Sequence, residues 1–232
     1  MPRMLWTLLG LSLAFVLPQS AHGQTQTPEG LLASAEESLG RFLADPEMSW
    51  FRDNLPSARG VLIVPRYLRA GFWVGGAGGR GVLVAREKDG PGWLGPVFYY
   101  LGSASLGVQV GVDLAEVVLL IMTDGGVDRL LGGDLKLGAD ARVAAGPVGV
   151  GTGASTADIL SFSRSRGLFA GIALDGGVIN PSGDFNQAFY GQAATPADIL
   201  VRRSVPPNPA GESLVRRVQT AAAPAIPVEA SE

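Results

Sequence analysis

A glycine-rich segment at residues 60–86 places the strongest constraint on how this chain can fold. It contains three short apolar runs, at residues 61–64, 72–74 and 82–85, which are rich in β-branched or aromatic residues and bounded by glycine or proline. Runs of this length and composition predict β-strands rather than helices. Because glycine lets neighbouring backbones approach closely, the segment predicts a tightly turned sheet around which the rest of the chain packs.

Length and glycine content favour a single β-rich domain. The chain has 232 residues, of which 47% are hydrophobic and 33 are glycine. That length fits one domain with or without tails, and the apolar content is sufficient for a core. A helix bundle would lose about 1 kcal/mol for each interior glycine relative to alanine, so a bundle is not expected.

The first 23 residues have the pattern of a secretory signal peptide. Arg3 supplies a positive charge, residues 5–16 form an apolar run, and Ala21-His22-Gly23 is a small-x-small cleavage site. An uncleaved membrane anchor is the alternative, but the run is nearer the roughly 7–15 residues of a signal peptide than the roughly 20 of a spanning helix. The pattern predicts cleavage near Gly23 and a periplasmic or secreted protein.

The residue types left after such cleavage exclude several kinds of active site. The chain has no cysteine, and its single histidine, His22, lies in the predicted signal peptide. Cysteine or serine–histidine nucleophiles and histidine or thiolate metal sites are then excluded. We expect no catalytic residue, no metal site and no cofactor. With 18 basic residues against 21 acidic ones, no broad basic surface for nucleic acid is expected either.

Two helices are predicted before the glycine-rich segment. Thr27 and Pro28 form a cap-then-proline start, and a second helix is predicted at residues 47–54, ending before Pro56. Either the pair contacts a membrane or it docks on the sheet. The acidic polar face of the first helix favours docking, because anionic bilayers attract lysine and arginine. Its apolar positions, at helical spacing, are Leu31, Leu32, Ala35, Leu39, Phe42 and Leu43.

The remaining strands and helices follow from shorter patterns. Six consecutive apolar residues at 117–122 are typical of a central strand buried on both faces. From Val205 a proline-rich linker, a weak helix at 212–223 and a disordered end are predicted. Other strands are predicted at residues 93–102, 105–113, 159–165 and 168–174, and helices at 127–131, 181–190 and after Thr195.

Several sequence blocks follow one another in a fixed order over roughly residues 30–200. They include Gly60-Val61-Leu62-Ile63-Val64-Pro65, Gly78-Gly79-Arg80-Gly81-Val82-Leu83, Gly107-Val108-Gln109-Val110-Gly111 and Ser161-Phe162-Ser163-Arg164-Ser165-Arg166-Gly167. This ordered series resembles the SYLF domain family. The resemblance implies a lipid-binding domain, because the family's eukaryotic members bind phosphoinositide membranes. Some members also bind actin, which is not carried over to an exported, secreted bacterial-type member.

Arginines that lie near aromatic residues in the sequence suggest a site for recognising a lipid headgroup. Arginine beside an aromatic ring and glycine backbone can hold a phosphate headgroup while the ring enters the membrane interface. Arg164 and Arg166 also alternate with serines, which places them on one face of a strand. The alternative is a solvated strand face with local ion pairs. The predicted lipid-binding residues are Arg66, Arg69, Trp73, Arg80, Trp50 and Phe51.

Glu116 is the acid for which burial is expected, because it enters the apolar run at residues 117–122. It is either a functional group or a buried acid satisfied by arginine or backbone partners. The second interpretation is favoured, since buried polar groups are normally hydrogen-bonded. A carboxylate-based hydrolase is a further alternative, but no pair of acids with the required arrangement stands out.

Together these patterns predict one α+β domain with a bent or barrel-like, mostly antiparallel sheet and helices at both ends. The expected function is non-enzymatic binding to a phospholipid headgroup or membrane surface. The alternative is a protein-interaction or envelope-scaffold module that binds an envelope protein through the same surface. The expected parts are a signal peptide at 1–23, an N-terminal helical segment at 24–58, a SYLF-like β-rich core at 59–203, and a proline-rich linker and flexible tail at 204–232.

Overall fold

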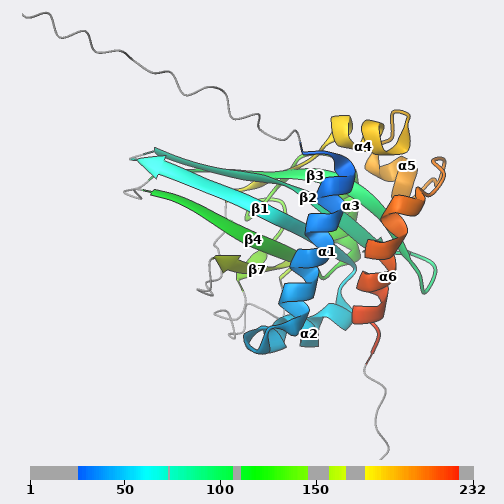
Figure 1. Ribbon diagram of the computed structural model, residues 1–232, viewed down its shortest axis with the longest axis horizontal. Helices are drawn as coiled ribbons and strands as arrows, with labels where there is room; N and C mark the ends of the chain where they lie inside the picture. Colours follow the sequence, from blue (N-terminus) through cyan, green and yellow to red (C-terminus); the bar gives the residue numbers. More distant parts are fainter. Residues whose placement is uncertain (1–25, 73, 107–110, 146–156, 166–175, 225–232) are drawn as a thin grey trace, which may run out of the picture.

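The glycine-rich segment forms the two middle strands of a curled sheet, with eight strands in the part of the chain that is described (Figure 1). Their bounds are β1 (Gly60–Phe72), β2 (Val74–Arg86), β3 (Trp93–Leu106), β4 (Gly111–Ile121), β5 (Leu135–Lys136), β6 (Val143–Ala145), β7 (Ile159–Ser165) and β8 (Val178–Pro181). The order is β5-β8-β3-β2-β1-β4-β7-β6, and only the β6–β7 pair is parallel. The computed structural model describes residues 26–72, 74–106, 111–145, 157–165 and 176–224.

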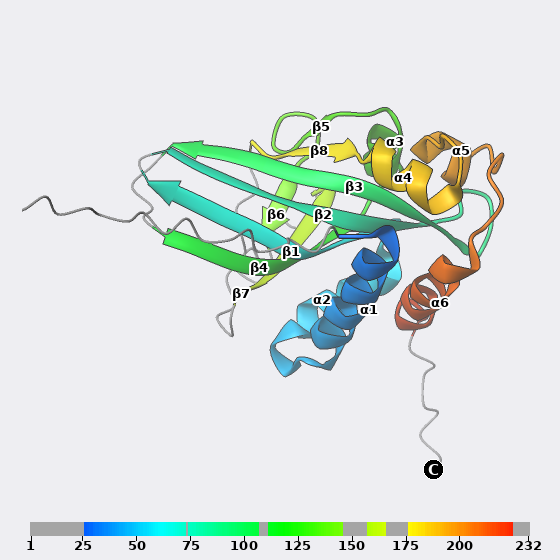
Figure 2. The same ribbon diagram turned by 45° about the horizontal axis from the view of Figure 1, so that its top comes forward.

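Helices cover both faces of this sheet (Figure 2). Across the described ranges they are α1 (Pro28–Ala44), α2 (Ser49–Asn54), α3 (Asp124–Leu131), α4 (Gly183–Tyr190), α5 (Pro196–Leu200) and α6 (Glu212–Ala221). One buried apolar cluster joins the sheet to α1, α2, α4 and α6, and a second joins it to α3 and α5. The single α+β domain with a curled, mostly antiparallel sheet is therefore confirmed.

Helix α1 begins where the sequence predicts. The Oγ1 atom of Thr27 accepts a hydrogen bond from the backbone N–H of Gly30 at 3.1 Å, and Pro28 opens the first turn. Of the six predicted apolar positions, all except Leu43 are buried. Because these side chains are buried against the sheet, α1 is docked on the sheet. This is the alternative that its acidic polar face favoured.

Several boundaries differ from the predictions. Residues 60–86 form two 13-residue strands instead of three short ones, and the predicted strand at 105–113 is split between the ends of β3 and β4. The strand predicted at 168–174 lies outside the described residues. The weak helix predicted at 212–223 is observed as α6, which buries Leu214 and Val218 completely in the core.

A β-bulge interrupts strand β1 at Pro65 and Arg66. Val64 pairs with Val117 and Tyr67 pairs with Ala115, so these two residues oppose the single residue Glu116 on β4. Proline is tolerated at a bulge because it has no N–H to donate to the ladder. On the neighbouring strand, a Cβ atom at Gly79 would lie 2.2 Å from the carbonyl oxygen of Arg66. Only glycine leaves room for this backbone approach.

Replacing Gly79 by alanine is therefore expected to lower the free energy of unfolding by about 1–3 kcal/mol, the usual cost of overpacking. Gly76 is the matched control, since it lies on the same strand and a Cβ atom there would meet nothing within 4 Å. Urea denaturation of the two alanine variants measures the difference. Equal stability of both variants would contradict the role of Gly79.

Candidate functional site

A cleft of about 590 Å³ lies between helix α1 and strands β1, β4 and β7. Three arginines and two glutamates contribute to its wall, so charged groups dominate it. The bulge in β1 supplies part of one side. The lining residues are Ser34, Glu37, Arg41, Pro65, Arg66, Leu114, Ala115, Glu116 and Arg164.

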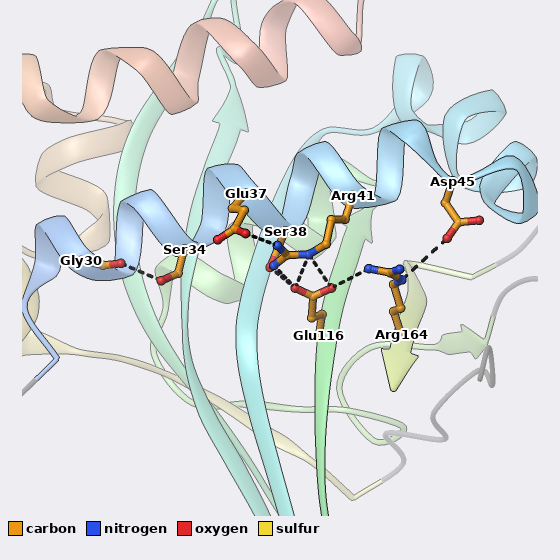
Figure 3. Close-up of polar contacts among 8 residues, drawn as sticks. All are labelled: Gly30, Ser34, Glu37, Ser38, Arg41, Asp45, Glu116 and Arg164. Atoms are coloured by element: carbon orange, nitrogen blue, oxygen red, sulfur yellow. Dashed lines mark hydrogen bonds and ion pairs between the residues drawn. The ribbon is translucent and has the colours of Figure 1, made fainter. Parts of the chain in front are cut away.

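The carboxylate of Glu116 joins α1 to the sheet (Figure 3). It accepts a hydrogen bond from Ser38 Oγ at 2.7 Å and one from Arg41 Nε at 2.9 Å, and Arg41 Nη2 donates a further bond. The Glu116 side chain is 16% exposed. Hydrogen bonding to Glu116 raises the pKa of Arg41. The predicted pairing of this acid with arginine is confirmed, and the acid is partly rather than fully buried.

Arg164 on β7 stands between two carboxylates without a close bond to either. Its Nη1 atom lies 3.6 Å from Glu116, and its Nε atom lies 3.7 Å from Asp45 at the end of α1. Both distances exceed a hydrogen bond. The Nε atom is buried and has no hydrogen-bond partner in the part of the chain that is described.

Arg66 is the third cationic group of the cleft. Its side chain is exposed, and the bulge places it opposite Glu116 on the α1 side of the sheet. Among the described residues it makes no ion pair. No acid in the described ranges therefore neutralises its positive charge.

Arg69 does not share this surface, although the sequence grouped it with Arg66. Side chains alternate along a strand, so Arg69 points to the face occupied by the buried Tyr67. There it donates a 2.6 Å hydrogen bond to Asp113, which also accepts one from Ser165. Bonding to Arg69 and then to Ser165 holds the pKa of Asp113 below its ordinary value. Arg69 therefore forms a local ion pair, which was the alternative to a role in lipid binding.

Arg80 is also held by its surroundings. Its guanidinium lies 4.4 Å from the ring centroid of Phe185 and 3.2 Å from Asp184, both on α4. The predicted arginine cluster is thus divided among the cleft, the opposite face of the sheet and α4.

The predicted membrane anchors differ in their burial. Phe51 is wrong as an anchor, because it is fully buried, with its ring centroid 5.6 Å from that of Phe42 and 5.2 Å from that of Phe162. Trp50 is half-buried and packs on Phe162 at 5.3 Å. Trp73 lies outside the described residues.

The sequence did not single out an exposed apolar surface on the far half of the sheet, where β1–β4 extend beyond the helices (Figures 1 and 2). Val112 is 75% exposed and Leu68 is 49% exposed. Leu68 pairs with Leu114 and Ala70 with Val112, so all four lie on the α1 side, next to the cleft. The hydroxyl oxygen of Tyr100 would lie 2.1 Å from a Cβ atom at Gly78, so the hydroxyl lies over Gly78, the residue that pairs with Leu68. We call this surface the tip face: Leu68, Ala70, Tyr100, Val112 and Leu114.

The described residues contain no group of three or more acidic, histidine or cysteine side chains placed to hold a metal ion. No described helix combines the length and apolar character needed to cross a membrane.

Substitution of Glu116 by glutamine is expected to lower the free energy of unfolding by about 1–3 kcal/mol, because the partly buried Arg41 loses the more buried of its two counter-charges. Glu37 is the matched control: it pairs with the same Arg41 but is 72% exposed, so its glutamine variant should stay within about 0.5 kcal/mol of the parent. Urea denaturation at neutral pH measures both variants. A loss as large for Glu37 as for Glu116 would contradict the assignment.

The Asp113–Arg69 pair should stabilise the fold at neutral pH but not in acid. Because the folded-state pKa of Asp113 lies below its ordinary value of 3.8, the stability it contributes is present above that value and is lost as pH falls through the folded-state pKa. The difference in unfolding free energy between the parent and Asp113→Asn, at most about 1 kcal/mol, should shrink below about pH 4. Urea denaturation across this range tests it, and a constant difference would be the contrary result.

Comparison with known proteins gives a consistent set of relatives. A family model described as "Ysc84: Las17-binding protein actin regulator" matches residues 102–221. "LAS seventeen-binding protein 3" of Saccharomyces cerevisiae is 34% identical over 214 residues, covering 89% of this chain and 46% of the relative. "SH3 domain-containing YSC84-like protein 1" of Homo sapiens is 34% identical over 152 residues, covering 63% of this chain and 44% of the relative. The chain thus spans less than half the length of these relatives.

Proposed function

The chain belongs to the Ysc84 family, the family to which the SYLF resemblance pointed, and on this premise we propose that it is a non-enzymatic module that binds a phospholipid surface peripherally. The observation that carries the proposal is the tip face, an apolar surface left uncovered by the described helices and bordered by Arg66, which makes no ion pair with any described residue. Exposed apolar patches rimmed by polar groups mark interaction sites.

The composition of this surface suits a membrane interface. Full burial of a leucine or valine side chain contributes about 1.5–3 kcal/mol, and Leu68, Val112 and Leu114 stand side by side on neighbouring strands. An arginine near an anionic bilayer adds about 1 kcal/mol. Partial insertion of three such side chains together with Arg66 is enough for reversible, peripheral binding.

Export is part of the proposal. The pattern at residues 1–23 is that of a secretory signal peptide, with cleavage near Gly23. The module would then act on a membrane surface reached from the periplasm or the exterior, as a secreted bacterial-type member of the family.

A second candidate is a protein-binding module that uses the same tip face. It is favoured by the relatives' names, which describe Las17 binding, and by the description of the family as actin regulators. For an exported protein the partner would be an envelope protein. Binding to a protein would persist in the presence of excess vesicles, whereas lipid binding would not.

Vesicle flotation of the purified chain tests the proposal. The parent should float with anionic phosphatidylserine-containing vesicles, and Val112→Asp should reduce binding by about tenfold or more, because a charge cannot enter the apolar interface. The matched control is Val201→Asp, since Val201 is also an exposed valine, at 59%, but lies at the end of α5.

Arg66→Gln should reduce binding to anionic vesicles at low salt and have little effect at high salt, because screening removes the arginine contribution. Failure of the parent to float with any vesicle would overturn lipid binding. Flotation that Val112→Asp leaves unchanged would remove the tip face from the site.

A further inference from the structure

We propose that the cleft between α1 and β4 is a phosphate-binding site, in which Arg66 and Arg164 hold one phosphate or phosphomonoester dianion. Either a lipid headgroup or a free phosphomonoester would supply this group. The inference rests on the proposed function only in the first case, because a cleft that binds soluble phosphate needs no membrane.

The cleft has both the room and the charge for such a ligand. Its volume of about 590 Å³ exceeds that of a phosphate group, so part of a larger molecule can enter with it. Three guanidiniums face two carboxylates, and one of these, Glu37, lies at the exposed rim paired with Arg41. Arg41 pairs with Glu37 and Glu116, and Arg164 lies near Glu116 and Asp45. The positive charge of the cleft that has no counter-ion among the described residues is therefore that of Arg66.

Two of the three arginines have donors to offer. Arg66 makes no ion pair within the described ranges, and Arg164 has only carboxylate contacts of 3.6 and 3.7 Å together with an Nε atom that has no hydrogen-bond partner. Guanidinium groups bind phosphate oxygens in a bidentate manner through short, charge-assisted hydrogen bonds. A dianion between these side chains would receive bonds that no described carboxylate now accepts.

The backbone fixes the position of Arg66. The extra residue in β1 leaves Pro65 and Arg66 together opposite Glu116, and Gly79 receives the Arg66 carbonyl on the neighbouring strand. Bulges commonly re-aim a side chain next to a functional site. The bulge therefore pre-organises one phosphate ligand before binding, which lowers the entropy cost of binding.

Glu116 is the internal competitor at this site. Its carboxylate lies between Arg41 and Arg164, so an entering dianion meets its negative charge. Removing that charge while retaining the side-chain shape should strengthen phosphate binding even though it weakens the fold. A merely structural Glu116 would not produce these two opposite effects.

Isothermal titration calorimetry of the full chain with inorganic phosphate, at constant ionic strength in chloride, tests the site. Arg66→Gln and Arg164→Gln should each weaken binding by about tenfold, the loss of one charge-assisted bidentate contact. Glu116→Gln should strengthen binding several-fold. Arg129→Gln is the matched control, because Arg129 is exposed on α3, against the other face of the sheet, and its affinity for phosphate should equal that of the parent.

Arg66→Gln keeps the test decisive even if Arg164→Gln unfolds, since Arg66 supports no ion pair among the described residues. Absence of phosphate binding by the parent, equal binding by Arg66→Gln, or no gain in Glu116→Gln would overturn the proposal. Glycerol 3-phosphate and phosphatidic acid vesicles distinguish the sources. Binding of the soluble ester without vesicle binding supports the cleft, and the membrane proposal then fails. Vesicle binding that Val112→Asp abolishes, but that Arg164→Gln and excess phosphate leave unchanged, supports the membrane proposal, and the cleft then fails.

Discussion

The extra residue in β1 opposite Glu116 is the constraint on which the rest of the structure depends. Between Val61 and Val64 on β1, and between Val117 and Ile121 on β4, apolar side chains cover both faces of the sheet, and α1 packs on one of these faces. At the bulge, Pro65 and Arg66 on β1 lie opposite the single residue Glu116 on β4. Beyond it the same strands continue with glycine, alanine and exposed leucine and valine, and the described helices no longer cover that face. The bulge thus lies at the junction between a packed half and a free half of the sheet.

Glu116 connects this junction to the N-terminal helix. A partly buried carboxylate is costly unless its lone pairs are satisfied, and Ser38 and Arg41 satisfy them from α1. The same contact fixes the position of α1 over the sheet. Among the described residues, Arg164 Nε has no hydrogen-bond partner and Arg66 makes no ion pair. Structural anchoring and local positive charge therefore arise from one arrangement, because the guanidiniums of Arg41 and Arg164 both lie at the Glu116 carboxylate and Arg66 is placed opposite it.

The tip face and the cleft lie on the same side of the sheet and are adjacent along β4, where Leu114 borders both. An apolar surface beside an arginine-lined cleft can engage an amphipathic ligand with its apolar part and its anionic part at once. Relatives of this chain are named as binding proteins, and a two-part surface of this kind is consistent with a binding role.

Local patterns in the sequence determined a large part of the fold. The Thr27–Pro28 start of α1, the apolar spacing along it, the buried half of β4 and the cap of α5 each depend on residues within a few positions, so the sequence alone predicted them. It also predicted that Glu116 would be buried with arginine partners.

The sites were decided by contacts between distant segments. Arg66 and Arg69 are neighbours in the sequence, but strand alternation sends them to opposite faces, and Phe51 is hidden because α2 packs on β7. Arg41 and Arg164 meet at Glu116 only after α1, β4 and β7 come together, across 75 residues of sequence in the case of Arg41. The sequence by itself determined which elements form and which faces they bury, because these follow from residue type and period. Only the tertiary structure decided which charges are paired among the described residues. Pairing depends on distances between strands and helices, and local patterns do not contain those distances.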